Sequence, residues 1–305
     1  MRVPLTVEVV TAIRDLELAA RLIVEGLRTG SERSPFLGVG AEFRQHRPYR
    51  PGDELKHVDW KVSARHDRLL TREVRETTNA SLLLVLDTSA SMAFPDGAHH
   101  KFRYAQVMAA ALAWIASDEG HAVGLLTTTP DPNTADGARL VYVAPRAGPL
   151  HRRQVLAAIA RLTPSGTWPA ERTVQRAAAL LRRRGVLTVL SDFYDDDVAV
   201  RRALREAARR GHDVRAWQVV APEERDLPAL ETVELEDVES GGRRLVHAAA
   251  FAPQYAAAHA AFLERWRTEA RRDGIAYVTL DTRVPPERAL RAALRAPAAR
   301  EERRA

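Results

Sequence analysis

Short apolar runs alternate with segments of helical periodicity from residue 81 almost to the end of the chain. An apolar run bounded by turn residues is typical of a buried strand, and apolar positions spaced three and four apart are typical of an amphipathic helix. Their alternation predicts a doubly wound α/β fold, in which helices cover both faces of a mostly parallel sheet. Strands are expected at 81–86, 122–128, 140–144, 186–190, 214–220 and 275–280, and helices at 104–117, 150–162, 170–184, 198–210, 253–273 and 286–294.

Two segments depart from the strand–helix alternation. Only a polar turn separates the strands at 122–128 and 140–144, which predicts an antiparallel hairpin. Residues 231–247 contain β-favouring positions on either side of Gly241–Gly242, which indicates a second strand pair.

The first 80 residues follow a different pattern. Apolar positions at helical spacing predict one amphipathic helix over 8–29, whereas 35–80 is rich in glycine, proline, charged and aromatic residues. We therefore expect three parts: an N-terminal helix with a β-rich extension over 1–80, the α/β domain over 81–296, and a disordered tail over 297–305.

Composition narrows the class of protein. Of 305 residues, 46% are hydrophobic, which suffices for a large core, and none is cysteine, which excludes disulfides and thiolate metal sites. The net charge is +6, but the arginines are dispersed among 40 acidic residues without interleaved aromatic residues, so no nucleic-acid partner is expected. No apolar run approaches the roughly 20 residues of a membrane span, and the N-terminus is a poor signal peptide. A cytoplasmic protein without a transmembrane segment is expected.

The segment LLLVLDTSASM carries the most informative polar residues. Its apolar run ends in Asp87, and Ser89 and Ser91 follow at alternate positions. Open α/β sheets bind ligands at the carboxyl ends of their strands, where this loop is expected. One carboxylate and two hydroxyls are hard oxygen donors, which suit Mg²⁺ or Mn²⁺ better than zinc. The segment therefore predicts a divalent-cation site, whose occupancy the sequence leaves open.

Two later loops are expected at the same edge of the sheet. One contains Thr167 and the other contains Asp192, which follows the strand at 186–190. If the strands at 81–86 and 186–190 are neighbours, these residues converge with the first loop on one ion. Each is also an acceptable helix cap when it is considered singly. Catalytic interpretations of Asp87 are weaker, because the sequence offers neither a second carboxylate two positions later nor a Gly-x-Ser-x-Gly elbow.

This arrangement resembles the von Willebrand factor A domain and its metal-ion-dependent adhesion site. The Asp-x-Ser-x-Ser loop, a later Gly-Thr loop and a later Ser-Asp after a strand match that family's pattern in order. The resemblance implies that the metal ligands are Asp87, Ser89, Ser91, Thr167 and Asp192. It also implies that the ion keeps an open coordination position, which an acidic side chain of a partner completes.

Residues 38–76 contain a distinctive set of glycine, charged and aromatic residues: Gly40, Glu42, Phe43, Arg47, Tyr49, Gly52, Asp53, Asp59, Trp60, Ser63, Ala64 and Arg65. This set resembles the signature of a bacterial family known as domain of unknown function 58, whose members pair the segment with an A-type domain. Glu54 and Lys56 stand where the family usually has aspartate and arginine. The charged and aromatic side chains are interpreted either as an ion-pair network with Trp60 in the core or as a partner-docking surface. The candidate residues are Glu42, Arg47, Tyr49, Asp53, Asp59, Trp60, Lys61, Ser63 and Arg65.

The family resemblance implies a function as well. Its members are often associated with MoxR-type AAA+ ATPases, so we expect a non-enzymatic adaptor that binds such an ATPase in protein maturation. The alternative is a metal-dependent hydrolase, phosphatase-like, that uses the same acidic cluster. The sequence argues against the hydrolase, because it places no general base, lysine or histidine near Asp87 or Asp192.

Overall fold

The computed structural model describes residues 6–28, 43–49, 58, 60–66, 68–74, 80–134, 137–181, 184–194, 197–225, 232–236 and 242–296. The chain forms two compact units. One comprises Met1–Glu32 together with Ser81–Ala305, and the other comprises Arg33–Ala80. The tail expected at 297–305 lies outside the described residues.

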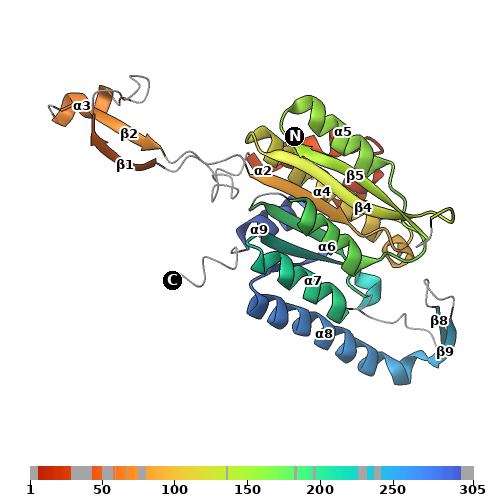
Figure 1. The fold of residues 1–305 in the computed structure, drawn as a ribbon. Helices are drawn as coiled ribbons and strands as arrows, with labels where there is room; N and C mark the ends of the chain where they lie inside the picture. The colour runs from red at the N-terminus through yellow and green to blue at the C-terminus, as the bar shows by residue number, and fades with distance from the viewer. Residues whose placement is uncertain are drawn as a thin grey trace. The chain divides into compact units, whose positions relative to one another are not determined.

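A six-stranded sheet organises the larger unit (Figure 1). Its strand order is β10-β7-β6-β3-β4-β5, and every neighbouring pair is parallel except β4 and β5, which form the expected antiparallel hairpin. The prediction of an α/β fold with a mostly parallel sheet is therefore confirmed. The strands are β3 (Ser81–Leu86), β4 (Ala122–Pro130), β5 (Ala138–Arg146), β6 (Val186–Ser191), β7 (Asp213–Val220) and β10 (Ala276–Asp281).

Helices cover both faces of this sheet because apolar residues alternate above and below its strands. On one face, the side chains of β3 and β6 form a core with three helices that includes Trp168 and Trp266. On the other face, a helix that is buried nearly all round contacts β3, β4, β6 and β7. The helices of the first face are α6 (Ala170–Leu180), α7 (Asp197–Arg209) and α8 (Ala248–Asp273); the second carries α4 (Lys101–Asp118), α5 (Pro149–Ala160) and α9 (Pro286–Arg295).

The N-terminal region differs from the single helix expected over 8–29. It contains α1 (Val7–Ala12) and α2 (Leu16–Arg28). Asp15 begins the second helix, because its Oδ1 accepts hydrogen bonds from the backbone N–H groups of Glu17 at 2.9 Å and Leu18 at 3.2 Å. Helix α2 packs against α4, α5 and α9. The predicted boundary at residue 80 assigned these two helices to the same part of the chain as the β-rich extension. Their apolar face instead packs against the unit that contains the six-stranded sheet.

The cap of α2 gives a first testable prediction. Asp15→Ala leaves two N–H groups of the first helical turn without their acceptor, so we expect it to lower the free energy of unfolding by about 1 kcal/mol. Asp15→Asn is the matched control, because its side-chain oxygen can accept the same bonds. Urea denaturation measures both variants, and equal losses in the two would contradict the capping role.

Within the described ranges, two small strand pairs lie outside the six-stranded sheet. In the unit of 33–80, β1 (Phe43–Pro48) pairs antiparallel with β2 (Leu70–Val74), and α3 (Trp60–His66) precedes β2. In the larger unit, β8 (Thr232–Glu236) pairs antiparallel with β9 (Arg243–His247), which confirms the strand pair expected over 231–247. None of the described helices combines the length and apolar character that a bilayer crossing requires.

Candidate functional site

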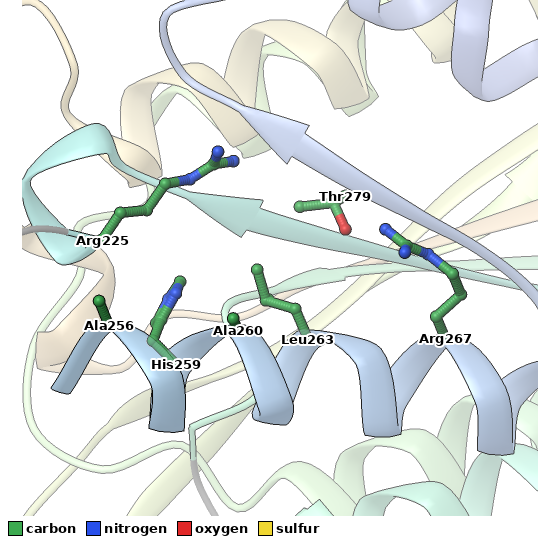
Figure 2. A pocket seen from close by; sticks show the side chains of 7 residues that line it. All are labelled: Arg225, Ala256, His259, Ala260, Leu263, Arg267 and Thr279. Atoms are coloured by element: carbon green, nitrogen blue, oxygen red, sulfur yellow. The ribbon is translucent and has the colours of Figure 1, made fainter. Parts of the chain in front are cut away.

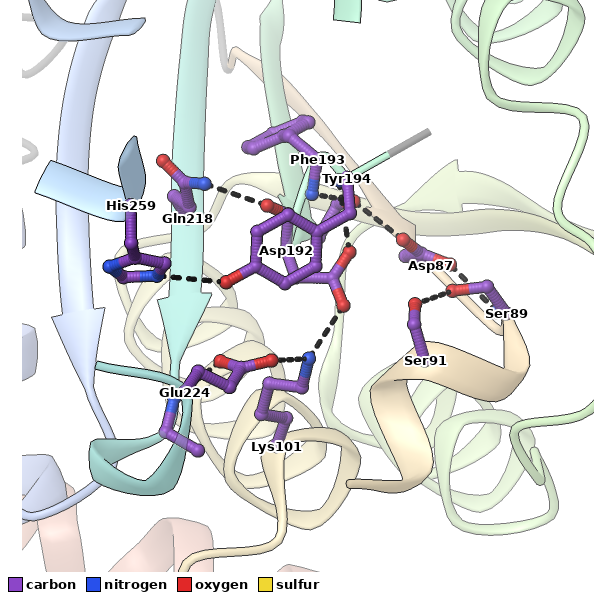
Figure 3. Close-up of polar contacts among 12 residues, drawn as sticks. Asp87, Ser89, Ser91, Lys101, Asp192, Phe193, Tyr194, Gln218, Glu224 and His259 are labelled. Atoms are coloured by element: carbon purple, nitrogen blue, oxygen red, sulfur yellow. Dashed lines mark hydrogen bonds and ion pairs between the residues drawn. The ribbon is translucent and has the colours of Figure 1, made fainter. Parts of the chain in front are cut away.

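The site lies where the two central strands β3 and β6 end side by side. These strands run parallel, with Leu86 opposite Leu190, and the next residue, Asp87, donates its backbone N–H to the Leu190 carbonyl at 2.9 Å. Strand β4 lies on the other side of β3, so the chain reverses its direction of winding between β3 and β6. This is the topological switch point at which open α/β sheets bind ligands. Asp87 and Asp192 therefore meet at one place, as the loop positions predicted (Figure 3).

The first loop folds back around the Asp87 carboxylate. Its Oδ1 accepts the Ser89 backbone N–H at 2.7 Å, and its Oδ2 accepts the Ser191 hydroxyl at 2.5 Å. The hydroxyl oxygens of Ser89 and Ser91 are 2.9 Å apart, and a short 3-10 helix, Ala90–Ala93, carries Ser91. Asp87 and Ser89 are buried, whereas Ser91 is partly exposed. The structure thus gathers these three oxygen side chains within one loop.

The loop that contains Thr167 is fastened to this first loop through its backbone. Ser165 donates its N–H to the Thr88 carbonyl at 2.8 Å, and the Gly166 carbonyl accepts the Ala90 N–H at 2.8 Å. Thr167 itself is exposed, and among the described residues its side chain makes no hydrogen bond with the four other predicted ligands. The structure therefore brings the Thr167 backbone next to the site without joining its hydroxyl to the cluster.

The Asp192 carboxylate has a partner that the sequence analysis did not identify. Lys101 Nζ donates to Asp192 Oδ2 at 2.7 Å and to Glu224 Oε1, so one ammonium joins two carboxylates. All three side chains are buried, and the Lys101 side chain is only 1% exposed. The expectation that no lysine lies near Asp192 was therefore wrong. The apolar pattern predicted that this helix begins at Tyr104. Helix α4 begins three residues earlier, at Lys101, and Lys101 therefore lies at the site.

A signal for Lys101 was present in the sequence. Helix α4 is apolar on all sides, which is the pattern of a helix buried all round. A charged residue that belongs to such a helix is buried with it and needs an opposite charge. Glu224 gave no comparable signal, because it lies in the short 3-10 helix Pro222–Glu224 after β7, far away in the sequence.

Burial and mutual repulsion govern the ionisation of this cluster. Burial, followed by the charge of Asp192, raises the pKa of Asp87 to about 7. Burial also raises the pKa of Glu224 against the opposing effect of Lys101. For Lys101, burial lowers the pKa, but Asp192 and Glu224 outweigh it, and the net pKa is raised. The lysine is therefore held in its charged form, whereas the Asp87 carboxylate is disfavoured as an anion.

A strained turn fixes the backbone after Asp192. Phe193 adopts the left-handed conformation with φ of 57°, which costs an ordinary residue roughly 1–2 kcal/mol. Its N–H donates to the Ser191 hydroxyl at 2.8 Å, and its ring lies 4.5 Å from the ring of Trp266 on α8. Gln218 of β7 donates to the Asp192 carbonyl at 2.7 Å. These contacts hold the Asp192 carboxylate towards Lys101.

The signature residues of the smaller unit differ in their exposure and in their contacts. Trp60 is 61% exposed, so it does not lie in a core of its own unit, and the partner-docking interpretation stays a prediction. Ser63 is buried, and its hydroxyl accepts the Leu70 backbone N–H at 2.9 Å, which ties α3 to β2. Tyr49 donates its backbone N–H to the Leu69 carbonyl, and Arg65 is exposed. Arg47 lies in β1 and Lys61 in α3, whereas Glu42, Asp53 and Asp59 lie outside the described residues.

Fold and site together define an α/β protein with a buried polar cluster at the switch point of its sheet. Residues 45–278 match the family described as "Protein of unknown function DUF58", and the chain belongs to this family. The match runs from β1 of the smaller unit to β10 of the sheet, so it covers both units. The resemblance to this family is thereby confirmed over residues 45–76.

Similar proteins occur in several bacteria. The chain is 32% identical over 236 residues to the uncharacterized protein Rv1480 of Mycobacterium tuberculosis, covering 75% of this chain and 71% of that protein. It is 40% identical over 50 residues to the uncharacterized protein YeaD of Bacillus subtilis, covering 16% and 13%. Among solved structures it is similar to the conserved hypothetical protein BatB of Bacteroides thetaiotaomicron, with 17% identity, a TM-score of 0.48, and coverage of 74% and 100%.

Proposed function

We propose that the larger unit is a von Willebrand factor A-like module that binds a protein partner through a divalent cation. The observation that carries this proposal is the convergence of Asp87, Ser89, Ser91 and Asp192 at the adjacent ends of β3 and β6. Thr167 is the fifth proposed ligand, contributed by the loop bonded to residues 88 and 90. The module is non-enzymatic in this proposal.

The chemistry of the cluster fits Mg²⁺ or Mn²⁺. Its donors are carboxylate and hydroxyl oxygens, which these hard cations prefer. Asp87, Asp192 and Glu224 carry three carboxylates against the single ammonium of Lys101, so negative charge is in excess within this set. Burial and, after it, the charge of Asp192 raise the pKa of Asp87, and a cation beside Asp87 would favour its charged form.

The surface around the site suits capture of an acidic side chain. Ser91 is partly exposed and residues 165–167 are exposed, whereas Asp87, Asp192 and Lys101 are buried. A cation held by the buried carboxylates would therefore face the surface on the side of the 165–167 loop. When bound, the ion would supply a positive charge for a carboxylate of the partner. The hydroxyl groups of Ser89 and Ser91 would hold the ion in place.

For the partner, we propose a MoxR-type AAA+ ATPase in the cytoplasm, for which this protein acts as an adaptor in protein maturation. The support is the family to which the chain belongs and the resemblance of its site to an adhesion site. Lys101 does not favour the hydrolase alternative, because its ammonium is buried and engaged by two carboxylates. It acts as a fixed counter-ion and not as a group available to a substrate.

The test is capture of the MoxR-type ATPase from the same organism by the full chain. We expect capture in Mg²⁺, and its loss both in chelator and in Asp87→Ala. Asp213→Ala is the matched control. Asp213 is the first residue of β7, so it lies at the amino ends of the parallel strands, whereas the site lies at their carboxyl ends. This substitution should leave capture unchanged. Capture that survives chelator and Asp87→Ala would contradict a metal bridge and point to residues 38–76 as the docking surface. Hydrolysis of phosphoesters that disappears in Asp87→Ala would replace the adaptor by the phosphatase-like alternative.

A further inference from the structure

A pocket lies between α8 and the edge strand β10, and none of the proposed cation ligands lines it. Its volume is about 380 Å³, which is within the usual range of small-molecule sites. Three apolar side chains of α8 form its floor, and charged or polar groups approach from three separate elements (Figure 2). The lining residues are Arg225, Ala256, His259, Ala260, Leu263, Arg267 and Thr279.

The pocket is cationic. Two guanidinium groups and an imidazole line it, and these described lining residues include no carboxylate. Each arginine is paired with a carboxylate that is not part of the lining: Arg225 pairs with Asp281 at 2.9 Å, and Arg267 pairs with Glu264 at 2.6 Å. Each pair leaves N–H groups of the guanidinium unused, since arginine carries five donors.

One of those unused donors is buried. Arg225 Nε is inaccessible to solvent and has no hydrogen-bond partner in the described part of the chain. An atom that water cannot reach is also closed to a ligand in the pocket, so the donors that a ligand can use are the terminal N–H groups of the two guanidinium groups. Positively charged donors of this kind favour a ligand that carries negatively charged oxygens.

The directions of the donors select the shape of the anion. Arg225 reaches the pocket from the loop after β7, Arg267 reaches it from α8, and both side chains extend towards Thr279 of β10. A carboxylate has two oxygens in one plane, and their geometry matches a single arginine fork. A phosphoryl group has three terminal oxygens that can accept from three directions. The Thr279 hydroxyl, now bonded to the Tyr277 hydroxyl at a long 3.2 Å, can rotate to join them.

We propose that this pocket binds a small phosphate monoester. Its phosphoryl group lies between Arg225, Arg267 and Thr279, and its organic part lies on the apolar floor of Ala260 and Leu263. The site is separate from the cation cluster, although Arg225 directly follows Glu224, which holds Lys101. His259 lines the pocket and is hydrogen-bonded to the Tyr194 hydroxyl at 3.0 Å, which keeps its ring at the pocket wall.

The test is calorimetric titration of the full chain with phenyl phosphate, at constant ionic strength and without divalent cations. We expect saturable binding, weaker binding of benzoate, and no binding of benzyl alcohol, because the three probes share one apolar ring and differ in the head group. Arg225→Gln with Arg267→Gln should weaken the binding of phenyl phosphate roughly tenfold or more, since each removes a charge-assisted hydrogen-bond donor. Thr279→Val should weaken it less.

Matched controls separate this site from general attraction to a basic protein. Arg265→Gln changes the same helix outside the lining, so it should not alter binding. Asp87→Ala should also leave it unchanged, so that failure of the cation proposal and failure of this one can be told apart. Equal binding by the double variant would overturn the site, as would absence of saturation in the unchanged chain. Tighter binding of benzoate than of phenyl phosphate would overturn the phosphoryl assignment.

Discussion

Replacing Lys101 with methionine is expected to lower the free energy of unfolding by about 3–5 kcal/mol, among the largest effects of any single substitution in this fold. The ammonium of Lys101 joins Asp192 and Glu224 in a region closed to water. Methionine keeps much of the side-chain volume but removes the charge. Two buried carboxylates would then face each other and Asp87 without a counter-charge, which is the costly way to break a buried ion pair.

A double variant separates lost charge compensation from lost packing. Lys101→Met combined with Glu224→Gln removes one carboxylate together with the ammonium, so it should be more stable than Lys101→Met alone. Urea denaturation of the two single variants and the double variant completes the cycle. A loss below about 1 kcal/mol in Lys101→Met would mean that water or a rearrangement solvates the carboxylates, and would contradict the counter-ion role.

The second large effect concerns Asp87→Asn and has opposite signs with and without metal. In the metal-free protein above pH 7, asparagine should be tolerated or stabilising, because burial and Asp192 make the charged carboxylate unfavourable there. Its amide oxygen can still accept the Ser89 N–H. With Mg²⁺ at 100 times its dissociation constant, the unchanged chain should gain about 2.7 kcal/mol, and the variant should gain little of this.

Thermal unfolding at pH 8, with Mg²⁺ and with chelator, measures both halves of this prediction. Asp213→Asn serves as the control, since Asp213 lies at the amino end of β7 and should leave the response to Mg²⁺ unchanged. An unchanged response in Asp87→Asn would remove Asp87 from the proposed ligands. A variant that is strongly destabilised in chelator would instead assign the carboxylate a structural role through Ser191 and Ser89.

Much of the sheet could be predicted because its signals are local. The strands at 81–86 and 186–190 are continuous apolar runs, and the observed β3 and β6 agree with them to within one residue. The expected neighbouring position of these strands is also confirmed, since a doubly wound sheet allows few arrangements. The helix expected over 8–29 failed for a local reason as well, because Asp15 competes for the backbone N–H groups that a continuous helix would bond.

The candidate site divides in the same way between local and long-range information. Asp87, Ser89 and Ser91 are close in sequence, and a tight loop after a buried strand keeps them close in space. Trp60 illustrates the opposite case: an aromatic residue among charges was compatible with a core or with a docking surface, and its exposure depends on which surface α3 presents. Periodicity over a seven-residue helix is too short to settle that choice.

The sequence by itself determined the alternation of strands and helices, the polar loop at the end of β3 and the family signature. Each of these features depends on residues that are close together in the sequence. Only the tertiary structure decided that Lys101 and Glu224, 123 positions apart, meet at Asp192. It also decided that Arg225, Arg267 and Thr279 share one pocket. Such contacts depend on how α4, α8 and the loop after β7 pack on the sheet, and burial of the whole core sets that packing.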